Sequence, residues 1–329
     1  MKTLFRWGAA LAFTMALLGP GTAAAQGTSA TSPDCLLVGA AANCTYNMQY
    51  QGGPVMTGNT TVYTIWYGDW SGTPNAQSAV AGLLGNLTGS PYMNLASLYG
   101  ASTTISYGGA VNITSANSAA QGWLGTNVSD SGLASILNDQ LANGTLPRST
   151  AAIYAIFTAP GVTEQESNLA CSFHANAGNL VYGWINGIQQ GCGNGVRPAD
   201  DLTANTTHLL FNALTDPQLG NATATSGPPL GWLDTNLQAE VADPCAFHQD
   251  AVTLGSGTYT VQQIFVNVPS LSHGGACVTS WSQATGPVGA VPELSTPKMS
   301  VLGLVTFGLI HARRRRSRDA APRARFSRR

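Results

Sequence analysis

Basic residues are confined almost entirely to the two ends of this 329-residue chain. Two of the 14 Lys and Arg residues lie within the first six positions, and ten lie from Lys298 onward. Between residues 7 and 297 only Arg148 and Arg197 are basic, against 14 acidic residues, so this body has a formal charge of −12. Such a body cannot neutralise a phosphate backbone, which excludes nucleic acid as its partner. The chain is 44% hydrophobic with seven Trp, enough apolar surface for a folded core.

The N-terminus has the layout of a secretory signal peptide. Lys2 and Arg6 precede an apolar run from Gly8 to Leu18, and three alanines ending at Ala25 follow a Gly-Pro-Gly break. The run is too short to span a bilayer, and small residues at its end are typical of a cleavage site. We therefore expect export, with cleavage after Ala25.

The C-terminal region combines three parts in a fixed order. Pro292-Glu293-Leu294 precedes the apolar run Met299 to Ile310, and the block Arg313 to Arg316 follows it. The run has twelve residues where a comfortable span needs roughly 20, and the arginine block agrees with the positive-inside rule. This layout resembles the PEP-CTERM sorting signal of bacteria that make exopolysaccharide, with Leu294 in place of the second Pro. The resemblance implies temporary anchoring in the inner membrane, cleavage at Pro292-Glu293 by exosortase-type machinery, and a cell-surface or extracellular location.

A body without internal repeats lies between these two ends, and it is read more readily as one domain than as two. We divide the chain into a signal peptide (1–25), a flexible lead (26–45), the body (46–285), the sorting signal with its hydrophobic segment (286–312) and a basic tail (313–329).

All six cysteines lie in the part of the chain that is predicted to be exported, and an even number in an oxidising compartment indicates disulfides. No Cys-x-x-Cys pair is present, so a cysteine-ligated zinc site is disfavoured. Fifteen connectivities are open for six cysteines. Short loops close at the smallest entropic cost, which favours Cys35 with Cys44, Cys171 with Cys192, and Cys245 with Cys277.

Hydrophobic periodicity predicts alternating helices and strands. Helices are expected over 75–87, 131–142 and about 199–214. Expected strands are Thr61–Tyr67, Thr103–Tyr107, Thr150–Thr158, Leu180–Ile185 and Tyr259–Val266. Thr150–Thr158 is almost wholly apolar, which is typical of a strand buried on both faces, whereas Leu180–Ile185 is expected at a sheet edge. The alternation predicts a single α/β (α+β) domain with a mixed central sheet flanked by helices.

Several segments together resemble the EXORDIUM (phosphate-induced protein) family of plant cell walls and its bacterial relatives, over roughly residues 45–280. They are Tyr50-Gln51-Gly52-Gly53-Pro54, Thr64 to Trp70, Cys171 to His174, Thr207 to Pro217, Gly231 to Asp234 and Glu240 to Cys245. The resemblance implies an exported surface or matrix protein with a body that is disulfide-stabilised and zincin-like in topology.

The resemblance also raises a question of metal chemistry at His208. In bacterial relatives this helix reads His-Glu-x-x-Glu, in which the His binds zinc and the adjacent Glu is the general base. Here Leu209 and Asn212 take the two carboxylate positions, which removes the base and leaves an amide, a poor zinc ligand. The candidate metal ligands are then His208, Asp216 and His174, and the site is expected to be that of a decayed hydrolase.

Other residues have both a functional and a structural interpretation. Asp234, Glu240 and Asp243 are candidate Ca²⁺ ligands in a stretch without EF-hand spacing. Asp216 before Pro217 is simply expected to end the helix. Trp66, Trp70 and Trp232 are candidates for stacking on sugars, with core packing as the commoner role.

Two functions from different classes remain. The first is a non-catalytic exported surface or matrix protein that binds polysaccharide and needs no cofactor. The alternative is a divergent zinc-dependent, peptidase-like hydrolase at His208.

Overall fold

The computed structural model describes residues 45–165, 171–187, 198–218, 229–268, 274–280 and 282. All of them belong to one compact unit, Met1–Gly289. The predicted signal peptide and sorting signal lie outside the described residues. Among the residues that are described, no helix has the length and apolar character needed to cross a membrane.

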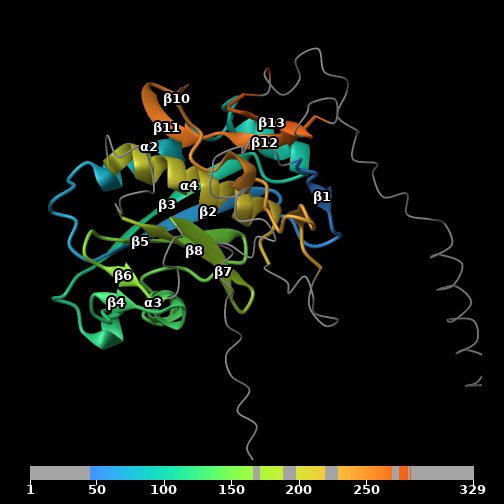
Figure 1. Cartoon of the computed structure of the whole chain (residues 1–329). Coiled ribbons are helices and arrows are strands. Elements are labelled where there is room, and N and C mark those ends of the chain that lie inside the picture. Colours follow the sequence, from blue (N-terminus) through green and yellow to red (C-terminus); the bar gives the residue numbers. More distant parts are fainter. Residues whose placement is uncertain are drawn as a thin grey trace, which may run out of the picture. The chain divides into compact units, whose positions relative to one another are not determined.

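A five-stranded mixed sheet forms the centre of the body, with strand order β3-β2-β5-β8-β7 (Figure 1). Four strands run parallel, and β7 pairs with β8 in the antiparallel direction. The bounds are β2 Asn59–Tyr67, β3 Thr104–Ile113, β5 Ala152–Thr158, β7 Ser172–Ala177 and β8 Leu180–Asn186. The mixed central sheet predicted from the sequence is therefore confirmed.

Strand β5 is buried at all seven residues, as its apolar sequence predicts for a strand with helices on both faces of the sheet. Strand β8 is equally buried and lies inside the sheet, so its predicted position at an edge is wrong. The edge strand on this side of the sheet is β7, which joins β8 through the two-residue turn Gly178-Asn179. Gly178 has φ of 66°, a conformation that glycine adopts without strain. The Gly-Asn turn between residues 172–177 and 180–186 is a hairpin signal in the sequence, although β7 was not predicted from it.

Three helices cover the sheet: α2 Ala76–Asn86, α3 Asp130–Ala142 and α4 Pro198–Thr215. Their predicted positions are confirmed to within a residue or two. Pro198 is suited to the first turn of α4, and Asp200 and Asp201 lie where the helix dipole favours acidic side chains. The helix ends at Thr215 because Pro217 cannot continue it.

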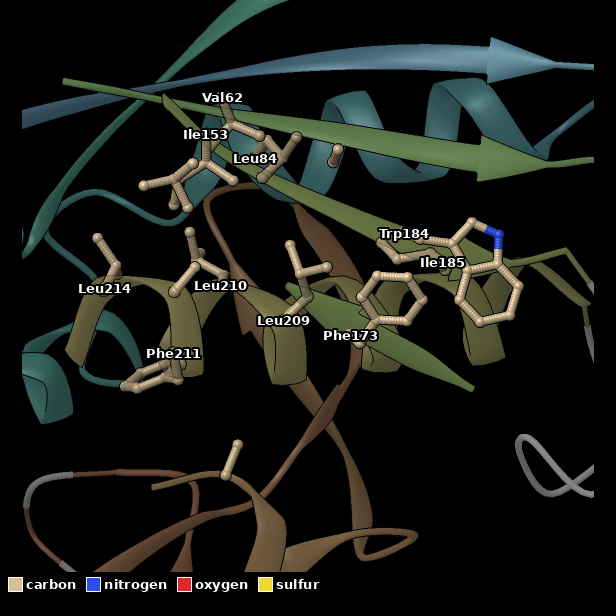
Figure 2. Packing of buried hydrophobic residues seen from close by; sticks show 14 of the residues in the cluster. Val62, Leu84, Ile153, Phe173, Trp184, Ile185, Leu209, Leu210, Phe211 and Leu214 are labelled. Carbon is tan, nitrogen blue, oxygen red and sulfur yellow. The ribbon is translucent and has the colours of Figure 1, made fainter. Parts of the chain in front are cut away.

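Helix α4 packs its apolar face on the sheet (Figure 2). Leu209, Leu210 and Leu214 point toward sheet residues that include Val62 and Ile153, whereas Phe211 points the other way. Leu209 is 2% exposed and lies against Gly183 of β8, where an added Cβ would come within 2.1 Å of the Leu209 Cδ1 atom. The leucine at the general-base position is therefore a packing residue of the helix–sheet interface.

Short elements complete the body around α4. Two-stranded pairs are β1 Gln49–Tyr50 with β9 Trp232–Leu233, β4 Asn127–Val128 with β6 Thr163–Glu164, β10 Gln249–Leu254 with β11 Gly257–Gln262, and β12 Ile264–Asn267 with β13 Gly275–Val278. Short 3-10 helices are η1 Met93–Tyr99, η2 Ala119–Gln121 and η3 Asp243–Cys245. The predicted strand Tyr259–Val266 is thus two strands, β11 and β12, interrupted at Gln263.

The predicted disulfide between Cys245 and Cys277 is confirmed, with an S–S distance of 1.98 Å and a Cα–Cα distance of 5.7 Å. It ties η3 to β13. Cys171 is disulfide-bonded as well. The predicted pairings Cys35–Cys44 and Cys171–Cys192 include residues outside the described part of the chain.

Replacement of Gly183 tests the contact between α4 and β8. We expect Gly183→Ala to lower the free energy of unfolding by about 1–3 kcal/mol, because the new methyl group overlaps Leu209. The matched control is Gly85→Ala in α2, where nothing lies within 4 Å of the added Cβ, and which should stabilise the helix by up to about 1 kcal/mol. Urea unfolding measures both, and equal effects of the two substitutions would contradict the packing role of Gly183.

Candidate functional site

Two histidines and three carboxylates lie between helix α4, strand β7 and the segment 230–245. We call His174, His208, Asp216, Glu240 and Asp243 the acid–histidine cluster. Exposure of His174, Asp216 and Glu240 is 3% or less, while the side chains of His208 and Asp243 are 16% and 14% exposed. Ionisable groups this far from water need partners, so each contact in the cluster affects the charge of the next.

His174 and Glu240 form a buried pair. The Nε2 atom of His174 lies 2.7 Å from Glu240 Oε1 and donates a hydrogen bond to it. Burial is the largest single influence and lowers the pKa of His174, but the charge and hydrogen bond of Glu240, together with the charges of Asp216 and Asp243, outweigh it and raise this pKa. The pair therefore favours an imidazolium next to a carboxylate.

Two side-chain amides bind the ring nitrogens of His208, and burial keeps the ring neutral. Gln262 donates from Nε2 to the carbonyl oxygen of Ala242 (2.8 Å), which turns its Oε1 atom toward His208. The Nδ1 atom of His208 donates to that oxygen at 3.1 Å. Its Nε2 lone pair then accepts from Asn212 Nδ2 at 3.3 Å. Burial lowers the pKa of His208, in agreement with a neutral ring whose two nitrogens both have partners.

Asn212 connects α4 to the segment that carries Glu240 and Asp243. Its Oδ1 atom accepts from the backbone N–H of Ala242 at 2.8 Å, and its Nδ2 atom donates to Asp243 Oδ1 at 2.9 Å. It lies four residues after His208, on the same side of the helix. The side-chain amide of Asn212, at the second-ligand position, therefore bridges α4 and this segment by hydrogen bonds.

Asp243 and Asp216 both hold protons more tightly than ordinary carboxyls. Burial, followed by the charge of Glu240, raises the pKa of each to about 7. Asp243 Oδ2 accepts from Glu240 N at 2.8 Å, and Asp216 Oδ1 accepts from Gly231 N at 2.9 Å. Asp216 Oδ2 and His174 Nδ1 are buried without a hydrogen-bond partner among the described residues.

The cavity at the centre of the cluster is about 10 Å³, close to the roughly 10–15 Å³ in which one water fits. It is lined by Ser172, Phe173, His174, His208, Leu209, Asn212 and Glu240. A space of this size holds no substrate.

The predicted metal ligands do not fit a zinc ion. His208 contacts Asp243, with 3.3 Å between Nε2 and Oδ1, and its ring nitrogens are already bonded to Gln262 and Asn212. His174 Nε2 is bonded to Glu240. In the part of the chain that the structure describes, no three His, Cys, Asp or Glu residues are arranged to hold a metal ion.

Both carboxylate oxygens of the candidate Ca²⁺ ligand Asp234 accept hydrogen bonds from backbone N–H groups. Its Oδ1 atom accepts from Asn236 N and Leu237 N at 2.9 and 3.0 Å, and its Oδ2 atom accepts from Asn47 N at 2.7 Å. This carboxylate closes a turn and ties it to the first described residues.

The three tryptophans proposed for sugar stacking lie in different surroundings. Trp66 is 1% exposed and stacks on Phe157 at a centroid distance of 4.3 Å, and Trp70 is 8% exposed and packs edge-on to Trp66. Both rings belong to the core, where a polysaccharide does not reach them. Trp232 is only half-buried, and its neighbour is Tyr50, an exposed ring whose motif indicated the family resemblance but no role in stacking.

Two contacts at the cluster were not predicted from the sequence, that of Gln262 with His208 and that of Glu240 with His174. Gln262 lies 54 residues from His208, and no motif marks it. Glu240 was considered only as a Ca²⁺ ligand, although it pairs with His174 across 66 residues. The arrangement in sequence carries no signal for either contact, because α4 and β7 meet the segment 230–245 only in the folded body.

We expect Glu240→Gln to destabilise the body by about 1–3 kcal/mol, because His174 loses its charged acceptor in a buried site. The pKa of His174 should fall, since the two contributions of Glu240 are lost and burial, the largest influence, is opposed only by the smaller ones of Asp216 and Asp243. Urea unfolding and the NMR titration of His174 measure the two effects. The exposed variant Asp250→Asn is the control and should change stability by less than about 0.5 kcal/mol. An unchanged His174 titration would contradict the pairing.

The stability of the body should depend on the proton of Asp216. Its pKa is raised from 3.8 to about 7 on folding, so its contribution is complete below pH 4 and is lost as the pH rises to 7. Asp216→Asn removes this titration and keeps an acceptor for Gly231 N. Relative to wild type, the variant should therefore gain stability between pH 4 and pH 7. Unfolding curves recorded at several pH values test this, and parallel pH profiles would count against it.

Comparison with known protein families gives one match. Residues 48–196 match the family model of the phosphate-induced protein 1 conserved region. Neither the comparison with curated proteins nor the comparison with solved structures gives a match. All five strands of the central sheet, His174 and the Tyr50 motif lie within the matched residues, while α4 and Trp232 follow them. The sheet-forming part of this chain is thus similar to the phosphate-induced protein 1 conserved region.

Proposed function

We propose that this protein is an exported, non-catalytic surface or extracellular-matrix protein of the EXORDIUM-like type that binds polysaccharide. The observation that carries the proposal is the state of the acid–histidine cluster. Its polar groups bond mainly to one another and to the backbone, so the cluster joins α4, β7 and the segment 230–245 instead of acting on a substrate.

The position equivalent to a hydrolytic site supports this interpretation in three ways. Leu209 packs on Gly183, Asn212 bridges to Ala242 and Asp243, and the cavity between the histidines is the size of one water. The zinc-dependent alternative needs three ligands around one point, and the described residues supply two separate pairs, His208 with Asp243 and His174 with Glu240, but no group of three.

Disulfides support an oxidising compartment. Cys245 and Cys277 are bonded, Cys171 is disulfide-bonded, and such bonds persist mainly in exported proteins. The match to the phosphate-induced protein 1 conserved region agrees with an EXORDIUM-like body. The predicted signal peptide directs export. The predicted sorting signal anchors the chain temporarily in the inner membrane, where exosortase-type machinery is the partner that cleaves it.

Fractionation of the producing cells tests the location. We expect surface-extracted protein to lack residues 1–25 and the block Arg313 to Arg316, as read by mass spectrometry of its terminal peptides. A Glu293→Ala variant should keep the arginine block and stay with the inner membrane. Full-length protein in the cytoplasm would refute export.

Two further measurements test the rest of the proposal. Purified body should sediment with the insoluble polysaccharide of the producing cells, and failure to sediment would refute polysaccharide binding.

Metal analysis should find no stoichiometric zinc. Zinc that is present in wild type and lost in His208→Ala would overturn the non-catalytic interpretation in favour of the hydrolase.

A further inference from the structure

Two sequence motifs that lie far apart build one exposed aromatic surface. Tyr50 of β1 pairs with Trp232 of β9, and their ring centroids are 5.7 Å apart at an angle of 39°. Tyr50 is 48% exposed, the highest value among the large hydrophobic side chains that are exposed in the described residues. Trp232 is half-buried. We call these two rings the aromatic platform.

Hydrogen bonds hold both rings in place. The hydroxyl of Tyr50 donates to the carbonyl oxygen of Gly53 at 2.7 Å. The indole Nε1 of Trp232 donates to the carbonyl oxygen of Tyr99 at 2.8 Å, and its ring packs edge-on to the Tyr99 ring at 5.2 Å. Both polar groups are therefore satisfied within the protein, and the exposed ring surface is preorganised for contact with something else.

The glycines of the two motifs are needed to build the platform. Gly52 has φ of 89° in the turn after Tyr50. An added Cβ at Gly53 would lie 1.9 Å from Pro229 O, and one at Gly231 would lie 2.0 Å from Thr215 O. These close approaches let Gln51 N bond to Gly231 O at 2.7 Å and Gly53 N bond to Leu230 O at 2.8 Å. The Tyr-x-Gly-Gly-Pro motif thus serves to present Tyr50 beside Trp232.

The surroundings of the platform select the class of ligand. The segments that form the platform, residues 45–68 and 229–233, contain no Lys or Arg, and the carboxylates that contact them, Asp234 and Asp216, are buried acceptors of Asn47 N and Gly231 N. An anionic chain would find no cation here and would be repelled by a body with a formal charge of −12. An aromatic face is matched by the C–H face of a sugar ring, which is apolar and carries no charge.

We propose that Tyr50 and Trp232 form a binding subsite for a pyranose ring of a neutral polysaccharide. This inference rests on the proposed function, because it names where the polysaccharide binds and to which class it belongs. The sugar ring lies on the exposed face of Tyr50 and reaches the half-buried edge of Trp232, and its hydroxyl groups stay in contact with water.

The test measures binding of the whole exported body, with its disulfides intact, to defined oligosaccharides by calorimetry. The neutral probes are the hexasaccharides of β-1,4-glucan, β-1,3-glucan and β-1,4-mannan, and the anionic probe is hexagalacturonate. Wild type should bind at least one neutral probe and should not bind the anionic one.

Substitutions at Tyr50 then locate the subsite. Tyr50→Ala should weaken binding by about tenfold, the loss expected for one aromatic contact, whereas Tyr50→Phe keeps the ring and should stay within about threefold of wild type. Phe247→Ala is the matched control, because Phe247 is 42% exposed and is not among the ring contacts of Tyr50 or Trp232, and it should bind like wild type. Thermal unfolding of each variant shows whether the body is folded, and Trp232→Phe gives a second, milder change to the platform.

The outcomes separate this inference from the proposed function. If wild type binds a neutral probe and Tyr50→Ala binds equally well, the platform is not the subsite, while polysaccharide binding stands. If wild type binds only hexagalacturonate, the neutral class is overturned. If no probe binds and the cell polysaccharide is not retained either, the inference fails together with polysaccharide binding. Retention of the cell polysaccharide with no binding to any neutral probe overturns the inference alone.

Discussion

The bridge that Asn212 makes between helix α4 and the segment 234–245 determines much of this structure. One amide accepts from Ala242 N and donates to both Asp243 and His208. These bonds place Glu240 where it meets His174 of β7, and the disulfide from Cys245 to Cys277 fastens the end of the same segment. Helix, sheet edge and loop are therefore joined by buried polar side chains and one disulfide.

The cluster also reflects the scarcity of Lys and Arg in the body. Arg148 is the only one in the described residues, and the carboxylates of the acid–histidine cluster have no lysine or arginine partner among those residues. Glu240 is paired with His174 instead, while burial and then the charge of Glu240 raise the pKa values of Asp216 and Asp243, so that these carboxyls retain protons. The scarcity of Lys and Arg in the body thus explains why Asp216 and Asp243 hold protons more tightly than ordinary carboxyls.

Much of the fold follows from local pattern. The helical periodicity of α2, α3 and α4 and the apolar run of β5 place these elements to within a residue or two, because local spacing alone decides which face of each is apolar. The wrong predictions concern features that depend on neighbouring strands. Strand β8 is interior because β7 folds back beside it. The predicted strand Tyr259–Val266 is interrupted at Gln263. The loss of carboxylates at Leu209 and Asn212 is also visible in the sequence.

What replaces those carboxylates is not visible there. The sequence by itself determined the charge of the body, the main elements and the absence of a general base beside His208. Only the tertiary structure decided that Asn212 is a bridge, that His174 belongs to Glu240, that Trp66 lies in the core and that Tyr50 stands exposed beside Trp232. The physical reason is distance along the chain: these partners are 30 to more than 180 residues apart, and packing of α4 and the short strands around the sheet brings them together.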